Sequence, residues 1–165
     1  FDVIEQYQGE AIQSKSGHSY IKEKMREHNA VYGGEMSAHH YFRDFAYCDS
    51  GMIPWLLAIS VLSETQQTLS SLVEGMIEKF PCSGEINFKV ADTQATIQKI
   101  FDHFSNQNPS IDHTDGVSLD FGAWRFNVRA SNTEPLLRLN IESRLDRHPK
   151  PMQDYVDELT RLIQS

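Results

Sequence analysis

The chain has 165 residues, of which 39% are hydrophobic and 23% charged, so it can bury a core in one or two modest domains. Its formal net charge of −8, without a basic cluster, argues against nucleic acid as a partner. No apolar run reaches the roughly 20 residues that span a membrane, so no membrane partner is expected either. A phosphate ligand stays compatible with this charge, because a few local donors decide anion binding.

The two cysteines and the first residues indicate the setting of the chain. Cys48 and Cys82 form neither a zinc-binding spacing nor a disulfide framework. We expect two buried thiols in a reducing compartment, the cytoplasm. The chain begins at Phe1 without an initiator Met or a signal-peptide pattern, and it reads as a helix entered partway through. We therefore expect it to be a piece of a longer protein.

The first part of the chain alternates between short strands and helices. We expect helices over residues 1–8, 18–28 and 53–62, and strands over residues 10–14 and 30–32. This alternation predicts part of a parallel α/β layer. The helix over 53–62 is apolar nearly all round, so it is expected to be buried, with Asp49 or Ser50 as its N-cap.

The second part has the pattern of an α+β domain. A helix over 65–80 ends at a Pro-Cys-Ser-Gly break, so we divide the chain into a first domain (1–68), a linker helix with a hinge (69–84) and a second domain (85–165). Alternating apolar residues predict four strands, over 86–90, 117–121, 124–128 and 137–141. Amphipathic patterns predict helices over 97–104 and 152–163. These elements favour a four-stranded antiparallel sheet backed by two helices.

The segment 129–135 carries the groups that grip a phosphate. Its arginine lies at the end of a strand on the face opposite the apolar residues, and its short polar side chains follow directly. The predicted phosphate-binding residues are Arg129, Ser131, Asn132 and Thr133. The one carboxylate, Glu134, would have to point away from a bound anion. The alternative is an ordinary hairpin loop whose polar side chains satisfy their own backbone.

The segment 33–40 has two glycines that let the chain turn after a buried strand, where parallel α/β layers bind ligands. Glu35, Ser37 and His39 then offer a carboxylate, a hydroxyl and an imidazole, which suit the hydroxyls of a sugar. No metal site is expected, because His39 and His40 project in different directions and no third ligand is evident. Ser37 also lacks a nucleophile-elbow motif. The alternative is a capped turn with a surface histidine.

The segment 14–19 is a predicted strand-to-helix turn. Lys15 can pair with an anion, and His18 lies at the start of the helix. His18 is therefore a candidate for giving or taking a proton. The alternative is a cap or a surface residue.

Three motifs together resemble the C-terminal part of the α-D-phosphohexomutases. They are the Lys-Ser-Gly-His-Ser motif of 15–19, the Gly-Glu-Met-Ser-Ala-His motif of 34–39 and the Arg-Ala-Ser-Asn-Thr-Glu-Pro motif of 129–135. The resemblance spans nearly the whole chain, and the second and third motifs are quite specific. Residues 33–55 are most similar to the bacterial phosphomannomutase (phosphomannomutase/phosphoglucomutase) branch.

The resemblance implies a fold and roles for the motifs. Family members have four domains and move a phosphoryl group between O1 and O6 of a hexose, through a bisphosphorylated intermediate and a phosphoserine enzyme. The chain would contain half of domain 3 and a domain 4 whose fold resembles the TATA-box-binding protein. Domain 3 would recognise sugar hydroxyls through Glu35 and Ser37, with Lys15 nearby and His18 and His39 as the catalytic pair. The loop 129–135 would hold the phosphate that is not transferred.

Two departures from the family pattern matter. Ala38 replaces the more usual glycine, which restricts the loop. The chain also has neither the active-serine loop of the Thr-Ala-Ser-His-Asn-Pro type nor the Asp-Gly-Asp-x-Asp-Arg magnesium loop. The Mg²⁺ ligands would lie upstream, so this chain alone is expected to be inactive.

The expected function is that of the C-terminal part of a cytoplasmic, Mg²⁺-dependent phosphomannomutase, which interconverts mannose 6-phosphate and mannose 1-phosphate. The alternatives are a phosphoglucomutase or phosphoglucosamine mutase, and a non-catalytic phosphosugar-binding module. The expected partners are a hexose phosphate and the missing N-terminal domains. Half of a parallel domain exposes a sheet edge and apolar surface, so residues 1–70 are also expected to self-associate.

Overall fold

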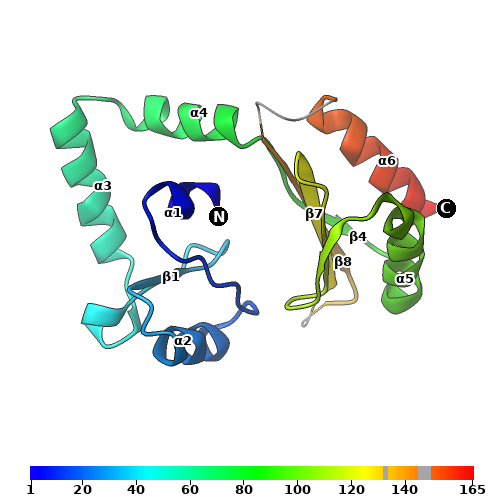
Figure 1. Cartoon of the computed structure of the whole chain (residues 1–165), viewed down its shortest axis with the longest axis horizontal. Helices are drawn as coiled ribbons and strands as arrows, with labels where there is room; N and C mark the ends of the chain where they lie inside the picture. Colours follow the sequence, from blue (N-terminus) through cyan, green and yellow to red (C-terminus); the bar gives the residue numbers. More distant parts are fainter. Residues whose placement is uncertain (132–133, 145–149) are drawn as a thin grey trace. The chain divides into compact units, whose positions relative to one another are not determined.

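The computed structural model describes residues 1–131, 134–144 and 150–165. They form two compact units, Phe1–Gln67 and Thr68–Ser165 (Figure 1). Each unit has its own cluster of buried hydrophobic residues.

The first unit is built around a small antiparallel meander. Its strands are β1 (Tyr32–Gly34), β2 (His40–Phe42) and β3 (Cys48–Asp49), in the order β1-β2-β3, with the 3₁₀ turn η1 (Arg43–Phe45) between β2 and β3. Its helices are α1 (Asp2–Gln6), α2 (His18–Glu27) and α3 (Met52–Thr65). Ile21 and Met25, one turn apart on α2, pack with the fully buried Tyr41 of β2 and form the core of this unit.

The three predicted helices of this unit are found, but the structure corrects both the expected alternation of strands and helices and the parallel pairing. Every strand pair among the described residues is antiparallel, and residues 10–14 form no strand. The reason lies in the connection between β1 and β2. A parallel pair needs a crossover of about a dozen residues or more, whereas residues 35–39 leave room only for a hairpin. Strand β1 also begins later than expected and is largely exposed.

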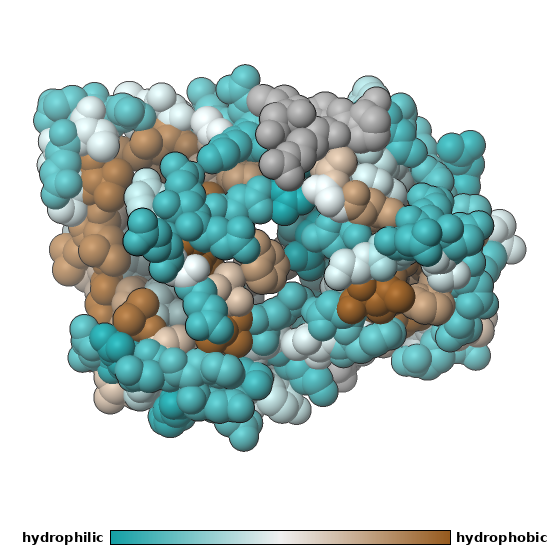
Figure 2. Space-filling view, viewed as in Figure 1, coloured by the Kyte–Doolittle hydropathy of each residue, from teal (hydrophilic) through white to brown (hydrophobic). Residues whose placement is uncertain are grey.

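Helix α3 forms where the sequence predicts it, but its expected burial is not found. None of its residues is buried, and Trp55, Leu56 and Leu57 are each more than half exposed. An apolar surface lies along this helix (Figure 2). An apolar pattern on all sides of a helix predicts that the helix prefers apolar surroundings, but it does not say which segment provides them. Among the described residues, none covers α3. Within residues 1–131, 134–144 and 150–165, no helix combines the length and apolar composition needed to cross a membrane.

The two cysteines correct a second burial prediction. Cys48 and Cys82 are free thiols and both are exposed. Cys48 lies in β3, at the edge of the meander, and Cys82 begins β4 (Cys82–Phe88), at the edge of the larger sheet. At these edges few neighbours remain to cover a side chain.

The second unit is the predicted α+β domain. Its sheet contains β4, β5 (Ser110–Asp112), β6 (Val117–Asp120), β7 (Trp124–Ala130) and β8 (Leu137–Ser143), in the antiparallel order β4-β8-β7-β6-β5. Its helices are α4 (Leu69–Lys79), α5 (Thr93–Phe104) and α6 (Met152–Gln164), with the 3₁₀ turn η2 (Ser105–Gln107) after α5. Helices α5 and α6 cover one face of the sheet (Figure 1).

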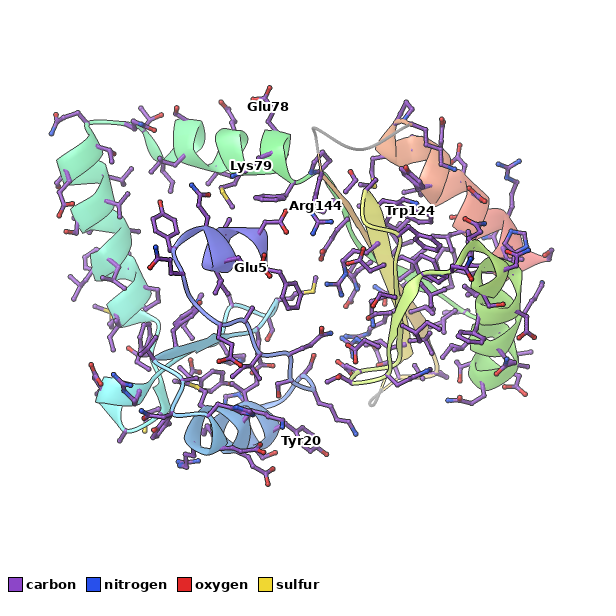
Figure 3. The ribbon with its side chains drawn as sticks, in the orientation of Figure 1. Glu5, Tyr20, Glu78, Lys79, Trp124 and Arg144 are labelled. Atoms are coloured by element: carbon purple, nitrogen blue, oxygen red, sulfur yellow. The ribbon has the colours of Figure 1, made fainter. Side chains whose placement is uncertain are left out.

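The core of this unit follows the alternation of its strands. Trp124, Phe126 and Val128 of β7 are buried, whereas the residues between them face the other side of the sheet. Trp124 stacks on Tyr155 of α6 with ring centroids 4.2 Å apart, and it lies among the side chains crowded between sheet and helices (Figure 3). Burying each such side chain contributes about 1.5–3 kcal/mol, which fixes the position of β7.

The sheet has five strands where the sequence predicts four. The added strand, β5, has three residues and pairs with β6 at the edge. Its only apolar residue, Ile111, is 44% exposed. A strand with one apolar residue has no alternation to detect, so its pairing with β6 can be found only in the folded sheet.

Candidate functional site

The structure brings His18 and His39 together. His18 begins α2 directly after Gly17, whose φ of 127° lets the chain enter the helix, and His39 directly precedes β2. The two imidazole rings meet edge to face with centroids 4.5 Å apart. The ring of Tyr41 lies 5.5 Å from that of His18. Two histidines that are 21 positions apart in the sequence thus form one cluster because α2 packs on β2.

Asp49 joins this cluster from the end of β3. Its Oδ2 lies 2.7 Å from Nδ1 of His39, and its Oδ1 accepts the backbone N–H of His40 at 3.0 Å. The hydrogen bond with His39, followed by that from His40, lowers the pKa of the Asp49 carboxyl. Of the two residues predicted to cap α3, Asp49 and Ser50, it is Ser50 whose Oγ accepts an N–H of the helix, that of Ile53, at 3.3 Å.

Glu35 connects the loop 35–39 to the start of α2 and to strand β2 through two hydrogen bonds. Its Oε2 accepts the N–H of Gly17 at 3.1 Å, and its Oε1 accepts the hydroxyl of Tyr41 at 2.5 Å. Burial, followed by this hydrogen bond, raises the pKa of the Tyr41 hydroxyl. A carboxylate has about four lone-pair sites, so Glu35 keeps acceptor capacity for a sugar hydroxyl after making both bonds.

The other predicted sugar-binding residues lie at the surface near this cluster. Ser37 is exposed in the turn between β1 and β2. Lys15 is also exposed, and its Nζ lies 5.9 Å from the centre of the Tyr20 ring. Lys15 and Glu35 both line a cavity of about 430 Å³ within the first unit. A cation and a carboxylate on one cavity suit a polar ligand.

The loop holds Ala38 in the conformation that glycine favours. Its φ is +64°, and its N–H bonds to the carbonyl of Glu35 at 3.0 Å, which closes the turn. A left-handed conformation costs a residue with a Cβ about 1–2 kcal/mol. The substitution seen in the sequence is therefore accommodated with backbone strain and without loss of the turn.

Ala38→Gly should stabilise the loop by about 0.5–1 kcal/mol, because relief of the left-handed strain exceeds the added freedom of the unfolded chain. Slower amide exchange across residues 35–39 would measure this. Ala58→Gly, in the right-handed interior of α3, is the matched control and should be destabilising by about 0.5–1 kcal/mol. Faster exchange in Ala38→Gly would contradict the assignment of strain.

The cluster does not fit Mg²⁺. Among the residues that the structure describes, possible metal-ligand atoms of His18, His39 and Asp49 lie within 4.8 Å of one another. Asp49 is therefore a third possible ligand, which the sequence did not make evident. Mg²⁺ prefers oxygen ligands in octahedral geometry, and two imidazoles with one carboxylate do not supply them. Asp49 is moreover engaged with both of its oxygens.

The second predicted site is the hairpin between β7 and β8. The N–H of Ser131 bonds to the carbonyl of Leu136 at 2.8 Å, and the Oγ of Ser131 accepts the N–H of Glu134 at 3.3 Å. These bonds close the loop from both ends. The predicted ligands Asn132 and Thr133 lie outside the described residues.

Arg129 lies on the sheet face opposite the core and is only 17% exposed. Its guanidinium lies 3.7 Å from Glu85 and 3.9 Å from Asp115. Its cross-strand neighbour Arg138 lies 3.5 Å from both Glu85 and Glu134. The carboxylate of Glu134 is thus partly neutralised, which reduces its conflict with a bound anion.

Two members of the first cluster, Tyr41 and Asp49, were not predicted as site residues. The signal for Tyr41 is its place in an aromatic-rich segment two residues after His39, where an alternating strand puts both on one face. The signal for Asp49 is a hairpin spacing, since Tyr41 and Asp49 are register partners. The signal for Asp49 is not visible without pairing β2 with β3.

The fold and the two clusters define a class: a two-unit protein in which polar loops present imidazole, carboxylate and guanidinium groups. Two family models match it. The model "phosphoglucomutase/phosphomannomutase, alpha/beta/alpha domain III" matches residues 1–80, and the model of the C-terminal domain matches residues 85–159. The chain belongs to the phosphoglucomutase/phosphomannomutase family, and the resemblance seen in its motifs is confirmed.

Individual relatives agree with this assignment. The chain is 60% identical to a Xanthomonas campestris protein named "phosphohexose mutases", over 88% of this chain and 32% of that protein. It is 54% identical to a phosphomannomutase of Escherichia coli, over 88% of this chain and 32% of that protein. It is 52% identical to a phosphomannomutase of Vibrio cholerae, over 98% of this chain and 35% of that protein. The chain therefore spans about a third of the length of these curated relatives.

A crystal structure of a phosphoglucomutase/phosphomannomutase family protein from Burkholderia thailandensis has the same fold. It superposes with a TM-score of 0.73 at 24% identity, over 98% of this chain and 34% of that one. At this identity the similarity concerns the fold alone.

Proposed function

We propose that the whole protein to which these residues belong is a phosphomannomutase, which interconverts mannose 6-phosphate and mannose 1-phosphate. The observation that carries the proposal is the contact of His18 with His39 beside Glu35, on motifs that resemble those of the family. The phosphomannomutase names of relatives at 52–54% identity support the choice of sugar.

In this proposal the first unit handles the sugar. Glu35, Ser37 and Lys15 bind its hydroxyls, because carboxylate, hydroxyl and ammonium groups together match groups that both donate and accept. His39 and His18 are the catalytic pair. One imidazole takes the proton of the attacking hydroxyl as that oxygen bonds to phosphorus and the bond from phosphorus to the serine oxygen breaks. The proton is returned to the sugar oxygen that is freed when a phosphoryl group passes back to the serine.

The second unit anchors the phosphate that is not transferred, through Arg129, Ser131, Asn132 and Thr133. Residues 69–84 serve as the linker helix and hinge between the domains 1–68 and 85–165. The phosphoserine and Mg²⁺, which supply the phosphoryl group and its charge stabilisation, belong to the rest of the protein. The exposed apolar residues of α3 support contacts with those domains, or self-association of the 165 residues alone. We propose the cytoplasm as the location.

The test is conversion of mannose 1-phosphate to mannose 6-phosphate by the whole protein with Mg²⁺, followed by ³¹P NMR, since the two phosphates differ in chemical shift. Glucose 1-phosphate and glucosamine 1-phosphate in parallel reactions rank the competing mutase activities; the name "phosphohexose mutases" of the Xanthomonas relative favours including glucose. Faster turnover of glucose or glucosamine phosphate would reassign the sugar. Binding of these phosphates without conversion of any of them would indicate a non-catalytic module.

Arg129→Ala in the whole protein should raise KM roughly 10- to 150-fold with kcat little changed. A charge-assisted contact is worth about 1.5–3 kcal/mol, and a phosphate that stays bound throughout contributes equally to substrate and transition state. Steady-state kinetics on mannose 1-phosphate measure both constants. Arg161→Ala, which removes an exposed guanidinium from α6, should leave both unchanged. An unaltered KM in Arg129→Ala would refute the anchoring role.

A further inference from the structure

We propose that Asp49 is the positioning residue of His39: its carboxylate holds the imidazole with Nδ1 protonated and leaves Nε2 to exchange a proton with the sugar. This inference rests on the proposed function. The relevant observation is the 2.7 Å contact between Oδ2 of Asp49 and Nδ1 of His39. Asp49 itself acts through His39 and is not assigned a contact with the substrate.

The chemistry of the pair fixes the tautomer. An ionised carboxylate has acceptors only, so Nδ1 of His39 must be the donor in this hydrogen bond. An Asp carboxyl is ionised at neutral pH, and the bonds with His39 and His40 lower the pKa of Asp49 further. In neutral His39 the other nitrogen, Nε2, then carries the free lone pair. A ring held in this form is ready to accept a proton without first exchanging one.

The backbone prevents the carboxylate from turning away. Oδ1 of Asp49 accepts the N–H of His40 at 3.0 Å while Oδ2 is engaged with His39, so both oxygens are fixed. The N–H of Ser50 bonds to the carbonyl of His40 at 2.9 Å, and Tyr41 is the register partner of Asp49. The pairing of β2 with β3 therefore sets the orientation of the imidazole.

The groups around His39 suit the transfer of a proton from a sugar hydroxyl to Nε2 of His39 and back. When the sugar O–H bond breaks, the proton passes to Nε2 of His39 and the oxygen keeps the electron pair with which it attacks the phosphorus of the enzyme phosphoserine. As the new O–P bond forms, the bond between phosphorus and the serine oxygen breaks, and the serine oxygen leaves with that electron pair. The imidazolium then lies beside the negative charge of Asp49. The rings of His18 and His39 meet edge to face, and the Tyr41 ring, whose hydroxyl donates to the carboxylate of Glu35, lies 5.5 Å from the His18 ring.

Asp49→Asn in the whole protein separates positioning from folding. Asparagine has nearly the same shape, and its carbonyl can still accept the N–H of His40, but its amide would donate to Nδ1 and force the proton of His39 onto Nε2. We expect kcat to fall roughly 10²-fold, the size of a general acid–base contribution, with KM changed less than about 3-fold. Asp49→Glu keeps an accepting carboxylate and should recover part of kcat.

The tautomer is read directly, without substrate, from long-range ¹H–¹⁵N spectra of the protein labelled in its histidines. His39 should be protonated at Nδ1 in the wild type and at Nε2 in Asp49→Asn. Asp44→Asn is the matched control, because its carboxylate lies on the same meander but is 90% exposed and contacts only Arg43 among the described ion pairs. That variant should alter neither kcat nor the spectrum.

An unshifted tautomer, or an unchanged kcat, in Asp49→Asn would overturn the inference. Because the spectra report the tautomer of His39 without substrate, they test this inference separately from the proposed function. If the wild type converts no hexose phosphate, the proposed function fails, and with it the proton transfer to a sugar. If the wild type is active and Asp49→Asn equally so, the function stands and Asp49 has only a structural role.

Discussion

Replacing His39 with alanine is expected to lower kcat of the whole protein on mannose 1-phosphate by about 10²- to 10⁴-fold, the range of a lost general acid–base group. His39 is 41% exposed and contacts both His18 and Asp49, so its loss removes the proposed proton acceptor without emptying a core position. Steady-state kinetics with a ³¹P NMR endpoint would measure the change. KM should move far less, because the imidazole acts mainly in the transition state.

His28→Ala is the control, since it removes an imidazole from the C-terminal end of α2, in the same unit. Its kcat should match the wild type. His18→Ala tests whether the two rings act as a unit: the double variant with His39→Ala should then lose little more than the worse single variant. Multiplicative losses would mean independent roles, and full activity of His39→Ala would remove it from the mechanism.

Gly116→Ala is expected to destabilise the second unit by about 2–5 kcal/mol, the sum of a left-handed residue with a Cβ and an overpacked contact. Gly116 has a φ of +77°, and a Cβ there would meet the carbonyl oxygen of Val128 and lie 2.5 Å from Cβ of Arg129. The neighbouring atoms are largely backbone of β7 and cannot simply rotate away. Amide exchange across residues 117–143 would report the loss.

Gly122→Ala isolates the conformational part of that cost. Gly122 has a similar φ of +81°, but a Cβ there would meet nothing within 4 Å. Its cost should be only the left-handed share, about 1–2 kcal/mol. Equal losses in the two variants would mean that the contact with β7 contributes nothing. Because the clash falls on Arg129, Gly116→Ala should also raise KM, whereas Gly122→Ala should not.

The second unit could be predicted from the sequence because its pattern is local and complete. Each of its long strands alternates apolar and polar residues, and its two packed helices carry apolar stripes that reach a common core. Helix and strand ranges agree to within a few residues. Among the strands of this sheet, only β5 was not predicted, because its three residues with a single exposed Ile111 have no alternating pattern.

The first unit was harder because its structure depends on pairing between segments. Isolated apolar residues at 10–14 and 30–32 fit a strand of either kind, and only the short connection 35–39 decides that β1 and β2 run antiparallel. The burial of α3 was overestimated for a related reason. Sequence pattern gives the preference of a helix for apolar surroundings, and the described residues do not provide them.

The candidate site divides in the same way. His18, Glu35 and His39 could be named from their motifs, and the structure brings them into one cluster. Asp49 could not, because its role depends on the register between β2 and β3, and its position before a helix made a cap the simpler interpretation. The order of residues identifies groups with suitable chemistry, whereas strand register decides which of them touch.

The acidic neighbours of Arg129 have a consequence for how long a ligand stays. Glu85 and Asp115 hold the guanidinium in place before any anion arrives, so little side-chain entropy is lost on binding. The same carboxylates also attract the guanidinium, so a phosphate that binds gains only the amount by which its own attraction to Arg129 exceeds that of Glu85 and Asp115. Such a site is ordered in advance yet modest in affinity. Under the proposed function, this arrangement favours rapid release of the phosphate once the reaction is complete.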